Sequence, residues 1–542
     1  MSARALPMPC RQTLVFCAVF VCAAATLLFF APGREFYLRS FDHGVQLSIG
    51  RQILFGKVPG RDVLIASGPL AMYVSAFGLW ASGSLLGETL ICAFGYALAI
   101  ALVDRIVSRA APRWLGLSAA VWSGLLLARY YKWYVWLFPL ALLAALPRLP
   151  ELSRRGRTRW CLGVGLLLGL EWLFRFDLAC TGIAAALLWL VLFRRTDGAS
   201  TSRLSRECVL LITSFLLPIA AWFGVLVGVG GPQAIADYVA MTLHGSTGVA
   251  ARMSLPLPPF DWSAPWSTPS TLVIASCAAP LTLLIAVVVG LLNLSSTSHS
   301  SAAIPADLGE DSRGRLRSAR TLLATALIGL SVWHQALHRR DAQHLLQVLP
   351  AVIIALHVLA GGQWSVRTGM VRKLSLAWCA GALLVGIRLV PQGADDLSKD
   401  WHLVSRYAGL AHPLEHPEAV PAASAISWVH RHSSPEDALL VFPVDCQYYA
   451  LAERRQAGLI CAYFPGVFDA SPWPERDRAT IEKSRPRFVI VPTAFVEDRE
   501  HMDPFHAECI AARGDIAALV REEFPRVAFQ SGSVTVLARA EE

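Results

Sequence analysis

The feature that most constrains this chain is a series of long apolar runs, separated from one another by short polar or basic segments. A helix needs about 20 consecutive apolar residues to span the hydrocarbon core of a bilayer, and most of the runs approach that length. Only 16% of the residues are charged, against the ~25% typical of soluble domains. The sequence therefore predicts a polytopic all-α membrane protein with about eleven transmembrane helices. The expected spans are roughly 14–31, 84–107, 114–130, 133–147, 161–175, 178–194, 208–229, 271–293, 320–338, 343–360 and 374–391.

The basic residues in the connections predict how the chain is oriented, because cytoplasmic loops carry an excess of Lys and Arg. Placing every basic cluster inside gives a consistent alternation, provided that 68–107 crosses an odd number of times; the segment 68–83 is ambiguous between a span, an interfacial segment and a re-entrant segment. The basic clusters are 105–113, 148–159, 194–206, 313–320 and 367–373. The stretches that the alternation places outside are 32–67, 129–133, 175–177, 230–270, 338–344 and everything after Pro391.

From about residue 420 the pattern changes to short elements. Helix-like segments at 425–432, 447–455 and 475–483 alternate with apolar strand-length runs at 438–444 and 487–492. Such alternation is typical of a small α/β domain. The expected domains are a multi-span transmembrane domain, 1–391, with a first extracytoplasmic loop at 32–67, and an extracytoplasmic α/β domain, 392–542.

The first expected loop holds the most informative motifs. Asp42 follows the first apolar run closely, and the apolar residues between it and Phe55 suit a short helix lying in the membrane interface. Asp62 lies further along, in a Gly-x-x-Pro-x-x-Asp stretch that begins at Gly56. From composition alone, solvated loop residues are the favoured explanation for both carboxylates, with a functional site as the alternative.

Three other polar corners lie between apolar runs. Arg175 and Asp177 have almost no loop around them, and charges at membrane depth either pair with one another or face a polar cavity. The turn at 338–344 is either a solvated helix cap or a phosphate site, because Arg offers a planar fork to phosphate oxygens. Lys132 lies in an aromatic run that also suits an interfacial belt. The candidate residues of that turn are Arg340, Asp341 and His344.

At these residues the sequence resembles the GT-C superfamily of membrane glycosyltransferases, which includes protein mannosyltransferases and the lipid A aminoarabinose transferase. The resemblance rests on an ordered set of motifs: Asp42-His43-Gly44, the Gly-x-x-Pro-x-x-Asp stretch ending at Asp62, and Gly68-Pro69-Leu70 at the next apolar run. The 338–344 turn and the terminal α/β domain are also similar to uncharacterised bacterial members. The first ~90 residues carry most of the likeness.

The resemblance implies transfer of a sugar from a polyprenyl-phosphate carrier to an envelope acceptor (a lipid, glycan or protein) on the outer face of a bacterial inner membrane. Asp42 matches the catalytic acid of the family and is expected to act as a general base in an inverting displacement. Arg340, His344, Arg175 and Lys132 are expected to bind the departing phosphate, with Asp62, Asp177 and Asp341 nearby. Many members have Asp-Glu where this chain has Asp42-His43. This chain lacks the second carboxylate at that position, which puts a metal site there in doubt. The resemblance therefore implies no required cofactor, although a divalent metal is compatible with it.

Other classes of protein remain as alternatives. A polysaccharide polymerase or ligase also has many spans, but its key residues are expected in the 230–270 stretch, where only His244 and Arg252 are available. A transporter of envelope precursors is expected to show internal repeats and charges at mid-membrane, neither of which is evident. A degenerate member that only scaffolds an envelope complex is a further alternative. The formal charge of +9 is explained by the basic connections and does not indicate a nucleic-acid partner.

Overall fold

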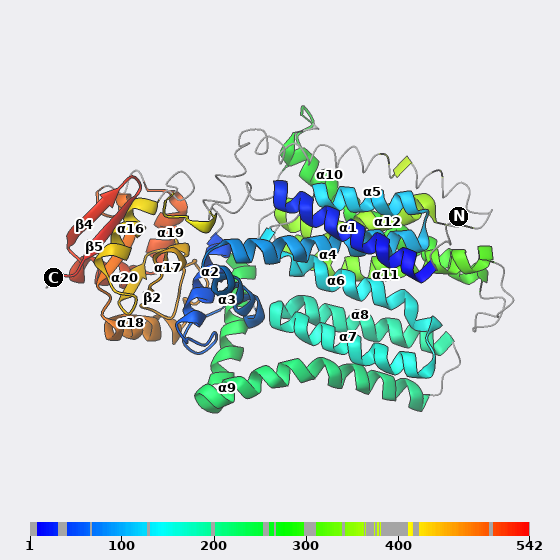
Figure 1. Cartoon of the computed structure of the whole chain (residues 1–542), viewed down its shortest axis with the longest axis horizontal. Helices are drawn as coiled ribbons and strands as arrows, with labels where there is room; N and C mark the ends of the chain where they lie inside the picture. The colour runs from blue at the N-terminus through cyan, green and yellow to red at the C-terminus, as the bar shows by residue number, and fades with distance from the viewer. Residues whose placement is uncertain are drawn as a thin grey trace, which may run out of the picture. The chain divides into compact units, whose positions relative to one another are not determined.

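A computed structural model of the chain provides the coordinates (Figure 1). Apart from isolated positions between 364 and 380, the residues that it describes are 8–30, 41–65, 68–126, 130–196, 201–252, 259–264, 267–297, 310–338, 342–362, 410–415, 422–497 and 502–540.

The chain divides into two compact units, and each is built from three separate stretches of sequence. The first unit comprises Met1–Ala31, Cys92–Ala221 and Leu255–Lys399. The second unit comprises Pro32–Ile91, Trp222–Ser254 and Asp400–Glu542. The two units are described separately below.

The first unit is a bundle of helices, and α4 and α9 continue from it into the second unit. Its elements are α1 (Met8–Phe30), α4 (Leu86–Ala110), α5 (Arg113–Leu125), η2 (Tyr130–Lys132), α6 (Tyr134–Ala145), η3 (Leu146–Glu151), α7 (Arg154–Phe174), α8 (Phe176–Thr196), α9 (Thr201–Arg252), α10 (Thr268–Thr297), α11 (Glu310–His338) and α12 (Ala342–Gly361).

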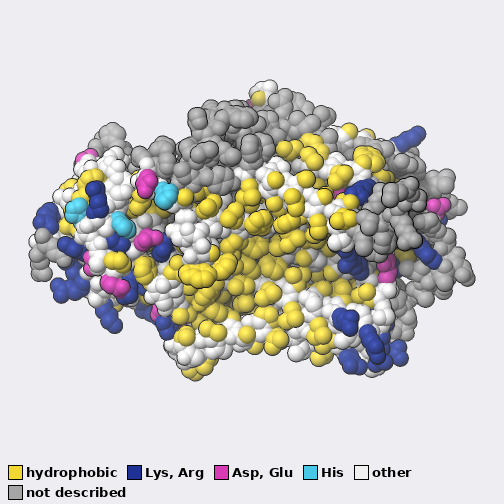
Figure 2. All heavy atoms as spheres, viewed as in Figure 1, with side chains coloured by type: hydrophobic (Ala, Val, Ile, Leu, Met, Phe, Trp, Pro, Cys, Tyr) yellow, Lys and Arg dark blue, Asp and Glu magenta, His cyan; other side chains and the backbone are white. Residues whose placement is uncertain are grey.

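Among the described residues, five helices are long and apolar enough to cross a membrane, namely α4, α8, α9, α10 and α12. Large apolar side chains on these and neighbouring helices face outward: Val209 and Leu217 of α9 and Val288 of α10 are more than half exposed. Hydrophobic side chains cover this face of the helices in Figure 2. A soluble surface rarely carries so large an apolar area. The bundle is therefore that of an integral membrane protein.

Contacts within the first unit define two opposite ends of the bundle. At one end α7 turns into α8, and His334 near the end of α11 reaches Asp177 of α8. The indole nitrogen of Trp136 in α6 donates to the carbonyl of Leu346 in α12, at 3.1 Å, so the starts of these helices lie side by side. We call this the corner end, after the turn at Arg175.

The other end of the bundle collects the basic connections. The Ser318 hydroxyl in α11 donates to the carbonyl of Ala110, at 2.7 Å, where α4 ends. Arg320 of α11 lies 3.7 Å from Glu151 of η3, which precedes α7. Clusters 105–113, 148–159 and 313–320 therefore share one end, as the charge bias predicted. We call this the arginine end; Lys and Arg side chains are prominent at the right of Figure 2.

The second unit contains a five-stranded sheet with the strand order β2-β1-β3-β5-β4. β1 pairs in parallel with β2 and β3, and β5 is antiparallel to β3 and β4. The strands are β1 (Ala438–Val441), β2 (Arg455–Gln456), β3 (Phe488–Pro492), β4 (Arg526–Ser531) and β5 (Val534–Ala538). The helices are α2 (Phe41–Leu54), α3 (Pro69–Ser82), α16 (Ala423–His432), α17 (Gln447–Ala452), α18 (Trp473–Ser484), η5 (Thr493–Phe495), α19 (Pro504–Ala512) and α20 (Gly514–Glu523).

The end of α2 and the connection to α3 cover the β2 edge of this sheet. The buried Gln52 side chain of α2 donates to the carbonyl of Arg454, at 3.0 Å, and accepts from the Gln456 backbone nitrogen, at 2.9 Å. Lys57 donates to the Gln456 carbonyl, at 2.7 Å, and the Leu64 backbone nitrogen donates to the Leu459 carbonyl. An unpaired sheet edge exposes backbone donors and acceptors. Here side chains and backbone from residues 52–64 satisfy them.

The expected secondary structure is largely confirmed. Helices occupy ten of the eleven expected spans, and 374–391 lies almost wholly outside the described residues. The helices α5 and α6, at 13 and 12 residues, are shorter than a full span. The expectation that 230–270 forms an outside loop was wrong as far as Arg252, because α9 resumes after a break at Gly231. The expected domain boundary near 391 lies outside the described residues.

Candidate functional site

An ion-pair cluster at the corner end of the first unit joins two of the expected site residues. Arg175 interrupts the helical path between α7 and α8 with an extended backbone, at φ −158° and ψ 99°. Its guanidinium contacts both carboxylate oxygens of Asp177, at 3.1 and 3.2 Å. Asp177 lies in the first turn of α8, where the helix dipole favours a carboxylate. His334 of α11 approaches the same carboxylate, at 3.2 Å.

Aromatic residues form the wall beside this cluster. Tyr131, Tyr134 and Trp136 are buried, with 2%, 5% and 1% exposure, and the Tyr134 and Phe174 ring centroids are 5.1 Å apart. Tyr131 and Trp136, two rings of the expected interfacial belt, therefore pack inside the bundle and not on its surface. Lys132 places its ammonium 5.4 Å from the centre of the Tyr131 ring. One expected cation therefore lies beside the aromatic wall.

The structure describes only part of the expected 338–344 site. His344 lies in the first turn of α12 and is partly buried, two residues before the carbonyl that accepts from Trp136. His344 therefore shares the corner end with Lys132 and Arg175. Arg340 and Asp341 lie outside the described residues.

In the second unit, Asp42 is the second residue of α2, so the short helix expected in the first loop is confirmed. Its side chain lies outside the described part of the chain. A Cβ added at Gly44 would lie 3.1 Å from the backbone nitrogen of Gln447 in α17. One at Gly50 would lie 3.0 Å from the backbone nitrogen of Ala76 in α3. The two glycines let α2, which carries Asp42, pack closely against both helices.

Glu88, which sequence reasoning missed, supplies a buried carboxylate directly beside the Asp42-His43 motif. His43 Nε2 lies 3.4 Å from Glu88 Oε1. Gln46 donates to the same oxygen, at 3.2 Å, and so does the Ser75 hydroxyl, at 2.5 Å. All four side chains are at most 5% exposed. The fold therefore places a buried carboxylate next to His43, although the two residues lie on different helices.

The Gly-x-x-Pro-x-x-Asp stretch forms a compact turn. Asp62 accepts a hydrogen bond from the Val58 backbone nitrogen, at 2.8 Å, and binds Arg61 through both carboxylate oxygens. Burial lowers the pKa of nearby Lys57 to about 8, while Asp62 opposes that shift and Arg455 adds to it. A buried amine loses the hydration that stabilises its charged form. Asp62 therefore holds the turn together and partly offsets the effect of burial on the Lys57 pKa.

Other residues missed by sequence reasoning are polar side chains inside apolar helices. Besides Glu88, they include His334 and the buried Glu171 of α7, whose carbonyl accepts from the Arg175 backbone. An ionisable residue within an apolar run is a usable signal for function. Within the described ranges, no group of three or more His, Cys, Asp or Glu side chains is arranged to hold a metal ion.

The helical bundle, with charged side chains gathered where its helices meet, is that of a polytopic membrane protein. No protein-family model matches the sequence, and a search of curated proteins finds no match. The fold does have solved counterparts. ArnT, the lipid A aminoarabinose transferase of Cupriavidus metallidurans, bound to undecaprenyl phosphate, matches with a TM-score of 0.51 and 15% identity, over 97% of each chain. The apo form gives the same values over 98% of each.

The archaeal oligosaccharyltransferase AglB from Archaeoglobus fulgidus, in complex with an inhibitory peptide and a dolichol-phosphate, also matches. Its TM-score is 0.46 at 12% identity, over 95% of this chain and 72% of AglB. Because the TM-score of AglB is below 0.5, the comparison of folds rests on the two ArnT structures. The predicted resemblance to the GT-C superfamily is confirmed at the level of the fold.

Proposed function

We propose that the chain is a glycosyltransferase that moves a sugar from a polyprenyl-phosphate carrier to an acceptor hydroxyl on a lipid, glycan or protein of the cell envelope. The observation that carries the proposal is the likeness to ArnT over 97% of both chains, in a structure that holds undecaprenyl phosphate. The proposed location is the bacterial inner membrane, with the terminal α/β segment on the extracytoplasmic side. The donor's phosphate is itself the leaving group.

The proposed reaction is an inverting displacement. The carboxylate of Asp42 accepts the proton of the acceptor hydroxyl while that oxygen attacks the anomeric carbon of the donor sugar. The bond between this carbon and the carrier's phosphate oxygen breaks, and the polyprenyl phosphate leaves with the electron pair. Such a reaction needs a positioned base and cations on the leaving group. It balances without a redox cofactor.

We assign the phosphate-binding role to cations at the corner end of the first unit, Arg175 and Lys132, together with His344 and Arg340. The geometry of Arg175 supports this assignment, because Asp177 fixes its guanidinium and a fixed planar fork suits phosphate oxygens. Asp177 and Asp341 would orient these cations. Asp62 would contribute by holding the 58–62 turn.

The decisive experiment compares envelope glycolipids and glycans, by mass spectrometry, between cells expressing the wild type and cells expressing Asp42→Asn. The amide keeps the size of the side chain but is not a base, so the transferred sugar should disappear from its acceptor. Asp261→Asn is the matched control, because Asp261 is an exposed carboxylate on a loop and carries no proposed role. Normal glycosylation in a well-expressed Asp42→Asn strain would end the assignment of the base.

The carrier-binding role is tested independently on the purified chain. Arg175→Gln should weaken binding of undecaprenyl phosphate by about tenfold or more, because a charge-assisted hydrogen bond contributes roughly 1.5–3 kcal/mol. The control is Arg485→Gln, at an exposed position after α18. Unchanged carrier binding in the Arg175 variant would exclude that residue while leaving the Asp42 test intact.

A further inference from the structure

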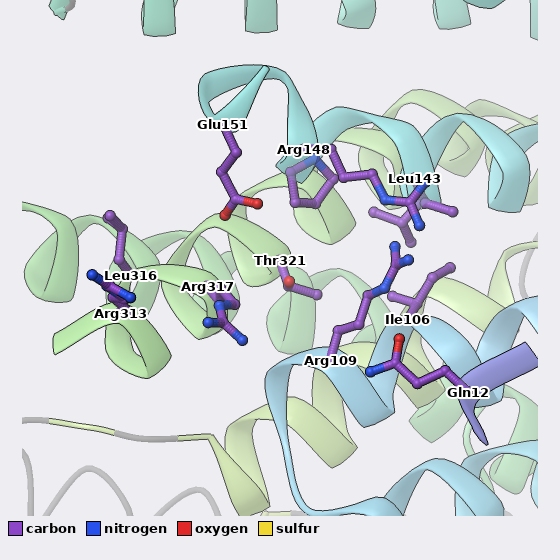
Figure 3. A pocket seen from close by; sticks show the side chains of 12 residues that line it. Gln12, Ile106, Arg109, Leu143, Arg148, Glu151, Arg313, Leu316, Arg317 and Thr321 are labelled. Atoms are coloured by element: carbon purple, nitrogen blue, oxygen red, sulfur yellow. The ribbon is translucent and has the colours of Figure 1, made fainter. Parts of the chain in front are cut away.

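The arginine end of the first unit contains a cavity of about 400 Å³ between α1, α4, α6, η3 and α11 (Figure 3). Among the described residues, its polar wall includes four arginines, Gln12, Thr321 and one carboxylate, Glu151. Figure 3 shows the guanidinium groups of Arg109 and Arg148 pointing toward each other. The arginines are Arg109 of α4, Arg148 of η3, and Arg313 and Arg317 of α11.

Among the described residues that line the cavity, the arginines outnumber the one carboxylate. Glu151 also lies 3.7 Å from Arg320, an arginine outside the lining, so its charge is shared. Burial lowers the pKa of Arg148, as does the neighbouring charge of Arg105, and the opposing influence of Glu151 is the smallest of the three. Like charges gathered in a partly desolvated cavity repel one another unless an anion joins them.

Much of the remaining wall is apolar. Ile106 of α4, Leu143 and Ala144 of α6 and Leu316 of α11 line the same cavity as the arginines. A cluster of guanidinium groups matches the oxygens of a phosphate group, to which Arg donates bidentate hydrogen bonds. Basic pockets between membrane helices are suited to anionic headgroups for the same reason.

We propose that this cavity is a binding site for a phosphate group, carried either by an anionic membrane lipid or by a soluble phosphate. The arginines bind the phosphate oxygens, and the apolar wall accepts the carbon atoms next to a lipid phosphate. The site lies at the opposite end of the first unit from Arg175. It is independent of the proposed glycosyl transfer and of Asp42, so either proposal can fail without the other.

The test measures binding to the full chain, purified in detergent, by isothermal titration. The probes are a short-chain phosphatidic acid, a phosphatidylcholine with the same acyl chains, and inorganic phosphate. We expect saturable binding of phosphatidic acid or of inorganic phosphate, and little binding of phosphatidylcholine. The double variant Arg109→Gln with Arg317→Gln should bind at least about tenfold more weakly, because it removes two charged contacts.

Two further variants distinguish specific binding in the cavity from nonspecific attraction to the positive surface. Arg155→Gln removes an exposed arginine of α7 at the same end but outside the cavity, and it should change affinity by less than about twofold. Leu316→Trp keeps every charge but narrows the cavity, so it should also weaken binding. It tests the proposal independently if the double variant does not fold.

The outcomes are distinct. Tight binding of phosphatidic acid with weak binding of inorganic phosphate identifies a lipid headgroup as the source, and equal binding of both identifies a soluble phosphate; either supports the proposal. The proposal is overturned if the wild type binds neither probe saturably. It is also overturned if Arg155→Gln weakens binding as much as the double variant, or if Leu316→Trp leaves binding intact.

Discussion

Replacing Gln52 by leucine should loosen the attachment of α2 to the edge of the sheet. The Gln52 amide is fully buried and makes two hydrogen bonds to the backbone around β2, one to the Arg454 carbonyl and one from the Gln456 nitrogen. Leucine has a similar volume but offers neither a donor nor an acceptor. The substitution therefore tests the contact between the helix that carries Asp42 and the α/β sheet.

The expected magnitude follows from the two backbone groups that leucine leaves without partners. A buried unsatisfied donor or acceptor costs about 1–3 kcal/mol, so two cost roughly 2–6 kcal/mol before compensation. The apolar leucine side chain recovers about 1–2 kcal/mol, because it buries no polar group of its own. We expect a net loss of about 2–4 kcal/mol in local stability at β2.

Hydrogen–deuterium exchange of the purified chain reports this loss directly, through peptides that contain residues 454–460. A loss of about 2–4 kcal/mol corresponds to exchange faster by about 30-fold or more at Gln456. Arg51→Gln is the matched control, because Arg51 precedes Gln52 on α2 and pairs with the exposed Glu453, at 2.8 Å. It should cost under ~1 kcal/mol. Unchanged exchange in Gln52→Leu, or an equal effect in Arg51→Gln, would refute the reasoning.

Competitive acetylation across pH should titrate Lys57 near its pKa of about 8, and Asp62→Asn should lower that pKa further; an upward shift would contradict the assignment. Because the folded pKa lies below the ordinary value of 10.5, the free energy of unfolding should rise between pH 8 and 10.5, and Lys57→Met should remove that slope. Gly44→Val should destabilise the chain by about 2 kcal/mol, because the branched side chain meets the α17 backbone; an unchanged thermal midpoint would mean looser packing. Asp477→Asn should cost about 2 kcal/mol, because the buried Arg513 loses one of its two carboxylate partners, Asp477 and Asp515; wild-type resistance of the terminal segment to proteolysis would argue against this.

Local patterns in the sequence predicted much of the secondary structure. The apolar runs predicted the bundle helices, and the alternation after residue 420 predicted α16, β1, α17, α18 and β3. The hairpin of β4 and β5 was missed, although its pairing completes the sheet. The break at Gly231 was missed as well, because helix continues on both sides of a single residue with φ +69°. Both features depend on backbone pairing or geometry that apolar periodicity does not encode.

The candidate site was predicted in its residue types but not in its contacts. The sequence alone marked Arg175 and Asp177 as a charged corner, because nothing else polar lies between those two apolar runs. Only the tertiary structure brought His334 to Asp177, across 157 positions, and Glu88 to His43. A residue's neighbours in sequence fix its helix or strand, through propensity and periodicity. Its partners across the fold are chosen by packing and by the need to satisfy buried polar groups, which depend on every element at once.

The sequence by itself therefore determined that this chain enters a membrane, where its helices lie and which connections share an end of the bundle. The reason is that the bilayer imposes its thickness and its charge asymmetry on each segment separately. The tertiary structure alone decided that Gln52 completes the edge of β2, 402 positions away, and that arginines from separate elements surround one cavity. Those juxtapositions arise from long-range packing, which no single segment specifies.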